Sequence, residues 1–170
     1  SVVYGFFGLV IIVPFVRLLG PGTGLSVLAA SLILGIMILP TVITVAQSAL
    51  DAVPARYYEG ALALGVDHEH AVFKVVAPAA ASGIMAAIVL GLGRAIGETM
   101  AVVMVAGNMP IIPDSLLSGV RTMTANIVLE MGYAADLHRE ALIATGVVLF
   151  VFILLITMLL NVIRKRGEAR

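Results

Sequence analysis

Long stretches without a charged residue constrain this chain more than any other feature of its sequence. They cover residues 1–16, 18–50, 75–93, 99–113 and 141–163. A helix needs about 20 mostly apolar residues to cross the ~30 Å hydrocarbon core of a bilayer, so these runs indicate membrane-spanning helices. The composition agrees, because 61% of the residues are hydrophobic and only 12% are charged, against ~25% charged in a typical soluble domain.

Turn signals and isolated charges divide the apolar runs into predicted spans. The sequence Gly-Pro-Gly-Thr-Gly at residues 20–24 is a turn signal. The two runs that flank residues 94–98 are most simply joined into one long helix. We therefore predict an all-α, polytopic transmembrane helical bundle that forms a single domain over residues 1–170. Its four spans are expected at about residues 1–16, 25–47, 79–107 and 141–163.

The two ends of the chain suggest how it is oriented. The first run is short and lacks an initiator Met and a basic leader, so we interpret it as a helix truncated at its start rather than a signal peptide. Arg164, Lys165 and Arg166 directly follow the last run, and basic residues next to a span favour the cytoplasmic side. This orientation puts residues 48–78 in a cytoplasmic loop and residues 108–140 in a periplasmic loop.

Several classes of function are excluded by what the sequence lacks. Its formal net charge is zero, so no basic field would attract a nucleic acid. Without cysteine it has no disulfide and no thiolate metal site. No P-loop motif and no nucleophile–base–acid constellation is visible, and His68 and His70 fall on different helix faces. We expect no enzyme activity, no metal and no cofactor in this chain.

The cytoplasmic loop carries helix signals at regular points. Pro54 suits the first turn of a helix, and Gly65 predicts its end. Asp67 is a candidate N-cap for a second short helix that runs to Ala77 and is closed by Pro78. The loop keeps many apolar residues outside the bilayer, which favours docking to another protein. Packing against the chain's own spans is the alternative.

The spacing of these residues resembles the EAA motif of ABC importer permeases. That motif is Glu-Ala-Ala, three residues, Gly, nine residues, Ile, one residue, Leu-Pro. Gly60 and Ala77 depart from it. The resemblance implies a type I ABC importer permease fold in which this loop transmits nucleotide-driven closure from a cytoplasmic ATPase, which binds the ATP and Mg. Glu59, Ala61, Gly65 and Pro78 match the motif, and Val75 is a conservative replacement for its Ile. The coupling residues that the resemblance implies are Glu59, Gly60, Ala61, Gly65, Val75 and Pro78.

Two charges lie deep in the predicted long span. Arg94 and Glu98 are four residues apart and would share one helical face. Each charge near the bilayer centre costs about 2.5 to 3.5 kcal/mol, so such residues normally face a polar interior or a transport pathway. A guanidinium fork suits an oxyanion, and Glu98 would hold Arg94 until the substrate arrives. The alternative is a buried ion pair that only fixes helix register.

The stretch 91–102, followed by Gly107 and Asn108, resembles the signature of PstC-type phosphate-importer permeases. Residues 38–41, 121–127 and 130–133 also resemble that subfamily. The resemblance implies the C-terminal half to two-thirds of an inner-membrane subunit that imports inorganic phosphate. It also implies contacts with membrane lipid, a second permease subunit, a dimer of ATPase subunits and a periplasmic phosphate-binding protein. The implied substrate pathway contains Arg94, Glu98, Thr99 and Asn108.

Two other transport functions stay open at this point. One is a permease of the same family for molybdate or sulfate, and the other is a proton-coupled secondary transporter or channel without an ATPase. The outer segment 114–132 has nearly helical spacing of apolar residues. It is expected to pack at the membrane interface, cap the pathway or receive the binding protein, with Arg121 and Asn126 as candidate contacts.

Overall fold

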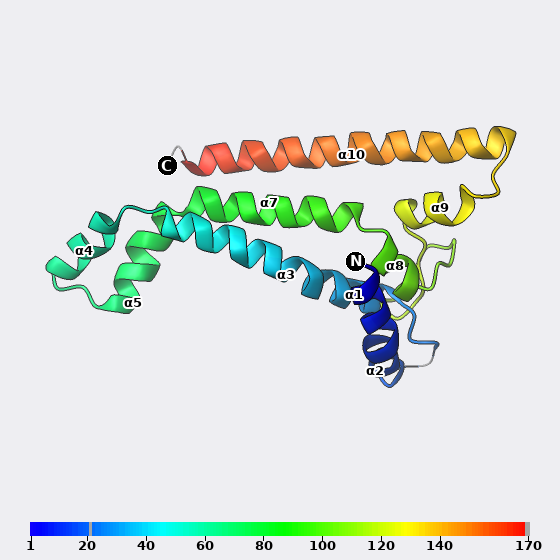
Figure 1. The fold of residues 1–170 in the computed structure, drawn as a ribbon, viewed down its shortest axis with the longest axis horizontal. Helices are drawn as coiled ribbons and strands as arrows, with labels where there is room; N and C mark the ends of the chain where they lie inside the picture. The colour runs from blue at the N-terminus through cyan, green and yellow to red at the C-terminus, as the bar shows by residue number, and fades with distance from the viewer. Residues whose placement is uncertain (21, 169–170) are drawn as a thin grey trace. The chain divides into compact units, whose positions relative to one another are not determined.

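The computed structural model describes residues 1–20 and 22–168, and all regular elements in this part of the chain are helices (Figure 1). The predicted all-α class is therefore confirmed. Two elements, labelled η, have π-helical hydrogen bonding. The elements in order are α1 (Val2–Phe7), η1 (Gly8–Ile12), α2 (Val13–Arg17), α3 (Val27–Asp51), α4 (Ala55–Ala63), α5 (His68–Ala71), η2 (Val72–Val76), α6 (Ala77–Ala79), α7 (Ala81–Gly97), α8 (Met100–Val105), α9 (Met123–Glu130) and α10 (Asp136–Glu168).

The chain divides into two compact units. Unit 1 comprises Ser1–Ile38 and Arg94–Leu155, and unit 2 comprises Leu39–Gly93 and the residues from Ile156 onward. The predicted pathway residues all belong to unit 1, whereas the residues that resemble the EAA motif all belong to unit 2. The two predicted functions therefore fall on separate structural units.

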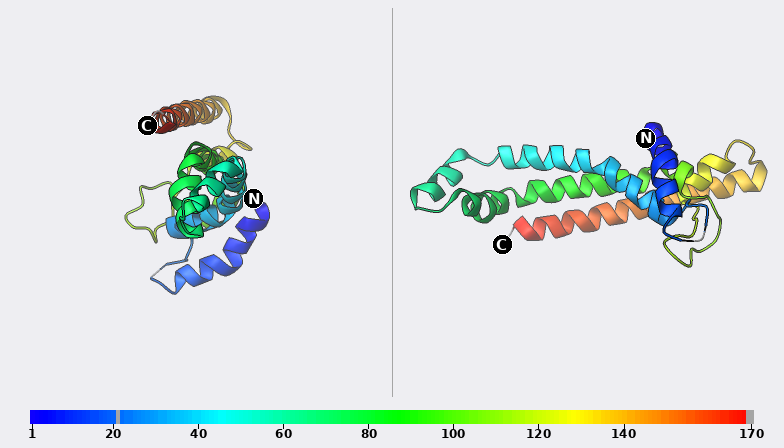
Figure 2. Two further views of the ribbon diagram at one scale, coloured as in Figure 1. Left: turned by 90° about the vertical axis from the view of Figure 1, so that its left-hand side faces the viewer. Right: turned by 90° about the horizontal axis from the view of Figure 1, so that it is seen from below.

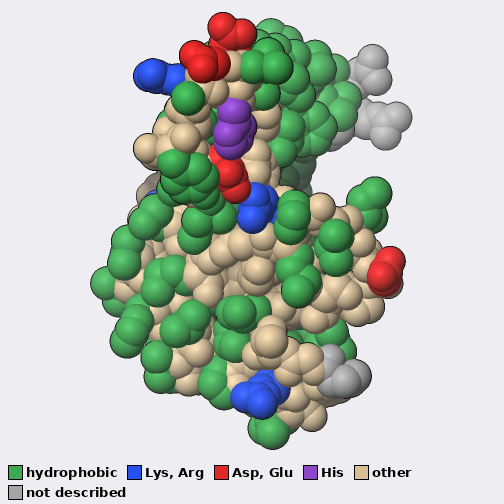
Figure 3. Space-filling model, turned by 90° about the vertical axis from the view of Figure 1, so that its right-hand side faces the viewer, with side chains coloured by type: hydrophobic (Ala, Val, Ile, Leu, Met, Phe, Trp, Pro, Cys, Tyr) green, Lys and Arg blue, Asp and Glu red, His purple; other side chains and the backbone are tan. Residues whose placement is uncertain are grey.

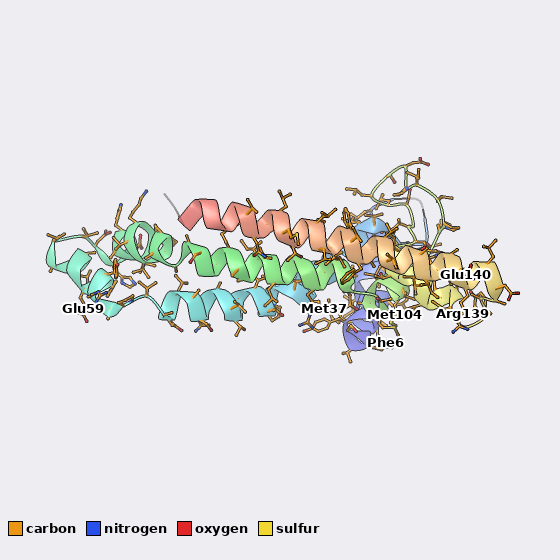
Figure 4. The ribbon with its side chains drawn as sticks, turned by 90° about the horizontal axis from the view of Figure 1, so that it is seen from above. Phe6, Met37, Glu59, Met104, Arg139 and Glu140 are labelled. Carbon is orange, nitrogen blue, oxygen red and sulfur yellow. The ribbon has the colours of Figure 1, made fainter. Side chains whose placement is uncertain are left out.

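Unit 1 is held together by close helix packing. The helical segment formed by α1, η1 and α2 packs against α8, and glycines allow the close approach. A Cβ atom on Gly5 would lie 2.9 Å from the Cα atom of Ala101, and one on Gly8 would lie 2.6 Å from Cγ1 of Ile33. The side chains of Phe6, Met37 and Met104, labelled in Figure 4, belong to this unit. The buried core consists of Val13, Val16, Ala29, Ala30, Val102, Val105 and Ala106.

The segment between α8 and α9 caps the start of α3. Its carbonyl oxygens at Leu116 and Ser118 accept hydrogen bonds from the backbone N–H groups of Leu28 (2.8 Å) and Val27 (3.0 Å). The first N–H groups of a helix have no partner within the helix, so these bonds satisfy α3 from a distant part of the chain. The helical spacing predicted over 114–132 is therefore wrong for its first part: only α9, over Met123–Glu130, is helical.

Unit 2 contains the second half of α3, most of α7 and a helical hairpin between them. The N-terminal part of α7 lies beside α3, where a Cβ atom on Gly83 would overlap the side chain of Ala49 (Figures 1 and 2). The hairpin consists of α4 on one side and the helical run His68–Ala79 on the other. That run is bent by 68° relative to α7. The helix predicted to close at Pro78 thus ends one residue later, at Ala79.

The count of four membrane spans is not reached. Among the described residues, α3 (Val27–Asp51) and the Asp136–Val162 part of α10 are long and apolar enough to cross a membrane, and the bent pair His68–Ala79 with α7 makes up to three. The first predicted span is helical over Val2–Arg17 but shorter than a full span. The prediction of one continuous helix over 79–107 is wrong, since the helix stops at Gly97 and resumes at Met100.

Candidate functional site

The break between α7 and α8 is built from Glu98 and Thr99. The Glu98 carboxylate turns toward the next helix, and its Oε1 atom accepts a hydrogen bond from the Ala101 N–H (3.1 Å). The Thr99 hydroxyl donates to the carbonyl oxygen of Gly97 (3.3 Å), where α7 ends. Both side chains thus bond to backbone groups that helix ends leave without partners. These local bonds explain why the apolar run does not form one continuous helix.

A cavity of about 230 Å³ lies beside this break, entirely within unit 1. The polar residues of its lining are Ser31, Glu98, Thr122 and Thr124. Thr124 Oγ1 donates to the Glu98 carbonyl oxygen (3.4 Å) and lies 3.1 Å from Thr122 Oγ1. The remaining lining is apolar: Val27, Ala30, Leu34, Ala95, Ile96, Val102 and Val120.

Arg94 and Glu98 differ in their position relative to α7 and in their exposure. Arg94 lies within α7 and is exposed, whereas Glu98 lies beyond the end of that helix and is half-buried. Because the helix stops at Gly97, the four-residue spacing does not place Glu98 on one helical face with Arg94. Within the described part of the chain, Glu98 lines the cavity and Arg94 is not among its lining residues.

Asn108, the last predicted pathway residue, closes α8. Its side-chain Nδ2 donates to the Val103 carbonyl oxygen (2.7 Å), and its backbone has a positive φ of 52°, following Gly107 at 83°. Asparagine tolerates this left-handed conformation better than most residues. Its Oδ1 atom is buried and has no hydrogen-bond partner among the described atoms. Asn108 does not line the cavity described above; it anchors the loop that follows α8.

Arg121 joins that loop to α9 through a network that the sequence did not predict. Its Nε donates to the Asn108 carbonyl oxygen (2.9 Å) and its Nη1 to Glu130 Oε1 (2.8 Å) and Asn126 Oδ1 (3.3 Å). Arg121 and Glu130 are only 23% and 22% exposed, and His138 Nε2 lies 3.9 Å from Glu130 Oε2. Figure 3 shows basic, acidic and histidine side chains following one another on one face. Arg121 and Asn126 therefore bond within the chain.

The hairpin of unit 2 forms as the sequence predicted. Pro54 immediately precedes α4, and Gly65 follows its end with a φ of 84°. The Val66 N–H donates to the Ala61 carbonyl oxygen (3.2 Å) and the Gly65 N–H to that of Leu62 (2.9 Å). These two bonds form a Schellman motif, in which the left-handed residue is usually glycine. The prediction that Gly65 ends the helix is confirmed.

Side chains then begin the second helix and tie it to the first. Asp67 is the N-cap of α5, and its Oδ1 accepts from the His70 N–H (3.4 Å) and lies 2.6 Å from His70 Nδ1. Across the hairpin, Tyr58 Oη lies 2.7 Å from His68 Nδ1, and the two rings meet edge to face. The N-cap predicted at Asp67 is confirmed. The Tyr58–His68 pair had no signal in the sequence.

The hairpin presents much of its surface to the outside. Glu59, labelled on α4 in Figure 4, is exposed, as are Gly60, Gly65 and Pro78, whereas Ala61 is buried and Val75 half-buried. Leu64 is 86% exposed and Phe73 is 73% exposed. Leu64 and Phe73 are therefore large apolar side chains on the outer surface of the hairpin.

Comparison with known proteins agrees with this arrangement. Residues 1–168 match the family described as "Binding-protein-dependent transport system inner membrane component". The chain belongs to this family. The permease chain is 39% identical, over 99% of its length, to the "Probable ABC transporter permease protein YqgH" of Bacillus subtilis (strain 168). It is 34% identical, over its whole length, to the "Phosphate transport system permease protein PstC" of Mesorhizobium japonicum.

The permease chain spans 55% and 58% of the lengths of these two relatives. A further relative, the PstC protein of Xylella fastidiosa (strain 9a5c), is 33% identical over 99% of the chain, which covers 60% of that protein. No solved structure matches the chain. Family membership and the apolar helices together show a multi-pass membrane protein, and its relatives are transport permease subunits.

Proposed function

We propose that this chain is part of the permease subunit of an ATP-driven importer that moves inorganic phosphate into the cytoplasm. The observation that carries the proposal is the similarity of the whole chain to permeases named for phosphate transport, at 33% and 34% identity. The chain would catalyse no covalent chemistry. ATP and Mg would be bound by a partner ATPase, whose nucleotide cycle switches the permease between outward-facing and inward-facing states.

The hairpin between α3 and α7 is the proposed coupling element. Its exposed Leu64 and Phe73 offer apolar surface to a partner, and Glu59 is an exposed charge on α4. The Schellman motif at Gly65 fixes the angle at which α4 meets the following helix. A rigid hairpin of this kind would move as a unit with its partner subunit and so transmit a conformational change to the spans. A flexible loop would not. Gly60, Ala61, Val75 and Pro78 complete the proposed coupling segment.

The proposed substrate pathway runs past the break between α7 and α8. Arg94 would attract the oxyanion with its guanidinium group, and Glu98 and Thr99 would offer polar side chains at the break. Asn108 would act one step away, because it fixes the end of α8 through its bond to the Val103 carbonyl oxygen. In this proposal, the helix break lets Glu98 and Thr99 offer polar groups to the passing substrate, which a continuous apolar helix would not do.

The orientation and partners complete the proposal. The basic residues Arg164, Lys165 and Arg166 favour a cytoplasmic C-terminus, and this orientation would put the hairpin on the side of the ATPase. A second permease subunit would complete the pathway, a dimer of ATPase subunits would bind the hairpins, and a periplasmic phosphate-binding protein would deliver the substrate. The apolar helices would be surrounded by membrane lipid.

The test is uptake of radiolabelled phosphate by proteoliposomes that contain the full-length permease pair, its ATPase and the binding protein. We expect uptake that requires ATP. ATP-dependent uptake of sulfate or molybdate without phosphate would indicate a permease for another oxyanion. Uptake that follows a proton gradient, with no ATPase bound to the permease, would indicate a secondary transporter and contradict the proposal.

A further inference from the structure

We propose that the loop of residues 109–116, between α8 and α9, inserts its apolar tip into the bilayer at the boundary between lipid headgroups and acyl chains. The loop thereby anchors unit 1 to the membrane beside the start of α3. Its partner is the apolar part of the lipid, not a particular headgroup. The inference rests on membership in a family of membrane components and is independent of the proposed substrate.

The tip of this loop is apolar and highly exposed. Residues 109–113 read Met-Pro-Ile-Ile-Pro and contain no charged residue. Ile112 is 89% exposed. The large apolar residues of the loop that are more than half exposed are Met109, Ile111, Ile112 and Leu116. An apolar patch of this kind indicates contact with a protein or with a membrane.

The base of the loop is fixed, so the tip is held in one place. The Val120 N–H donates to the Ala106 carbonyl oxygen (2.9 Å), and Val120 also pairs with Gly107 in an isolated bridge. On the other side of the tip, the carbonyl oxygens of Leu116 and Ser118 cap α3. A loop ordered in advance pays less conformational entropy when its tip enters the interface.

The place of the loop on unit 1 favours lipid as the partner. Its base bonds to the first residues of α3 (Val27–Asp51), which is long and apolar enough to cross a membrane. In both views of Figure 2 the loop, drawn in yellow-green, extends away from the helices of unit 1. A segment that extends sideways from the end of a span lies along the membrane interface, so lipid covers its apolar tip.

The residue types of the tip also suit lipid better than a protein. Pro110 and Pro113 have no backbone N–H, so they bring no donor that an apolar environment would leave without a partner. The tip has no aromatic residue and no arginine, which are the anchors of many protein interfaces. Asp114 follows the tip and is exposed, and its charge keeps the insertion shallow.

The experiment measures what surrounds the tip. The chain contains no cysteine, so Ile112→Cys can carry a single nitroxide label once any cysteine elsewhere in the full-length permease is replaced. The labelled permease, with its second permease subunit and ATPase, would be placed in phosphatidylcholine nanodiscs. Electron paramagnetic resonance then measures collisions of the label with oxygen, which concentrates in lipid, and with a water-soluble nickel complex.

We expect the ratio of oxygen to nickel collisions at Ile112→Cys to be at least about threefold higher than at Arg139→Cys, an exposed charged position of α10. Adding phosphatidylglycerol should leave the ratio unchanged, because the contact is apolar. Frequent collisions with nickel would show that the tip lies in water. Rare collisions with both reagents, with or without the binding protein, would show that a protein covers it. Either result would overturn the inference.

A charge at the tip gives a second, independent test. With the label moved to Ile111→Cys, Ile112→Glu should lower the ratio at least about threefold, because a carboxylate resists transfer out of water. The matched control Ile112→Leu keeps the apolar surface and should keep the ratio. Ile112 is so exposed that neither change removes much packing within the chain. An Ile112→Glu protein with an unchanged ratio would contradict insertion.

Discussion

The hairpin at residues 55–79 and the segment at residues 98–122 both interrupt apolar helices, but they do so by different means. In the hairpin, each turn is made by residues a few positions apart, such as the bond from Val66 to Ala61. The second segment is fixed by bonds between distant residues, such as Leu28 to Leu116. Both regions expose large apolar side chains, such as Leu64 in the hairpin and Ile112 in the second segment. Only the second segment also lines a cavity and contributes to the core of unit 1.

This difference matches the two tasks proposed for the regions. A surface that binds a partner needs exposed side chains on a locally rigid frame. A pathway needs polar groups held in fixed positions inside an apolar unit, and only distant parts of the chain can hold them there. Changes in the second segment are therefore expected to have larger effects on stability than changes in the hairpin.

The largest effect is expected from Arg121. Replacing it with Gln removes its ion pair with Glu130 and its bond to the Asn108 carbonyl oxygen, both partly buried. We expect a loss of about 2 to 3 kcal/mol in the free energy of unfolding, because Glu130 then keeps only the more distant His138, at 3.9 Å. Reversible unfolding of the full-length protein in mixed micelles measures this loss. Arg139→Gln, at an exposed position of α10 (Figure 4), is the control and should change stability by less than about 0.5 kcal/mol.

The next largest effect is expected at the contact of η1 with α3 and α8. A methyl group at Gly8 would lie 2.6 Å from Cγ1 of Ile33 and 2.9 Å from Cγ1 of Val105. Gly8→Ala should cost about 1 to 3 kcal/mol through overpacking. Gly35→Ala, in a helix with no atom within 4 Å of the added methyl, should be neutral or stabilising. Similar unfolding midpoints for the two variants would contradict the packing described for unit 1.

Within the hairpin, two glycines give a matched pair. Neither Gly60 nor Gly65 has an atom within 4 Å of an added Cβ, but only Gly65 has a positive φ, at 84°. Gly65→Ala should destabilise the hairpin by about 1 to 2 kcal/mol because L-residues disfavour this conformation. Gly60→Ala, within α4, should stabilise it by up to about 1 kcal/mol. Amide hydrogen exchange of residues 55–79 measures both; equal exchange rates would show that the Schellman motif does not control the hairpin.

The smallest effect is expected at the N-cap of α5. Asp67→Ala removes the acceptor for the His70 N–H, and an N-cap of this kind contributes about 1 kcal/mol. Exchange should rise in α5 while α9 in unit 1 is unaffected. Asp67→Ser, which restores a capping oxygen, should recover most of the protection. A variant without a cap that exchanges like the unaltered protein would show that the hairpin does not depend on local capping.

The same difference explains what the sequence could predict. Pro54, Gly65 and Asp67 act within a few residues, so the ends of the hairpin helices could be predicted from residue type and spacing. The break at Glu98 could not, because the charge-free runs on both sides favoured a continuous helix. Nor could the loop before α9, since its apolar spacing is helical while its carbonyl groups cap α3. Arg121 and Asn126 were identified as candidate contacts, but residue type and spacing did not show that Arg121 bonds to Asn126 and Glu130 of α9.

The most direct test of the account measures both regions in one preparation. Proteoliposomes would contain the complete importer with either the unaltered full-length permease or Glu98→Gln, at equal incorporation, and both ATP hydrolysis and phosphate uptake would be recorded. We expect the hairpin still to bind the ATPase, so that hydrolysis persists, while phosphate uptake falls at least about tenfold. Unchanged phosphate uptake by Glu98→Gln would contradict the assignment of the pathway to the α7–α8 break.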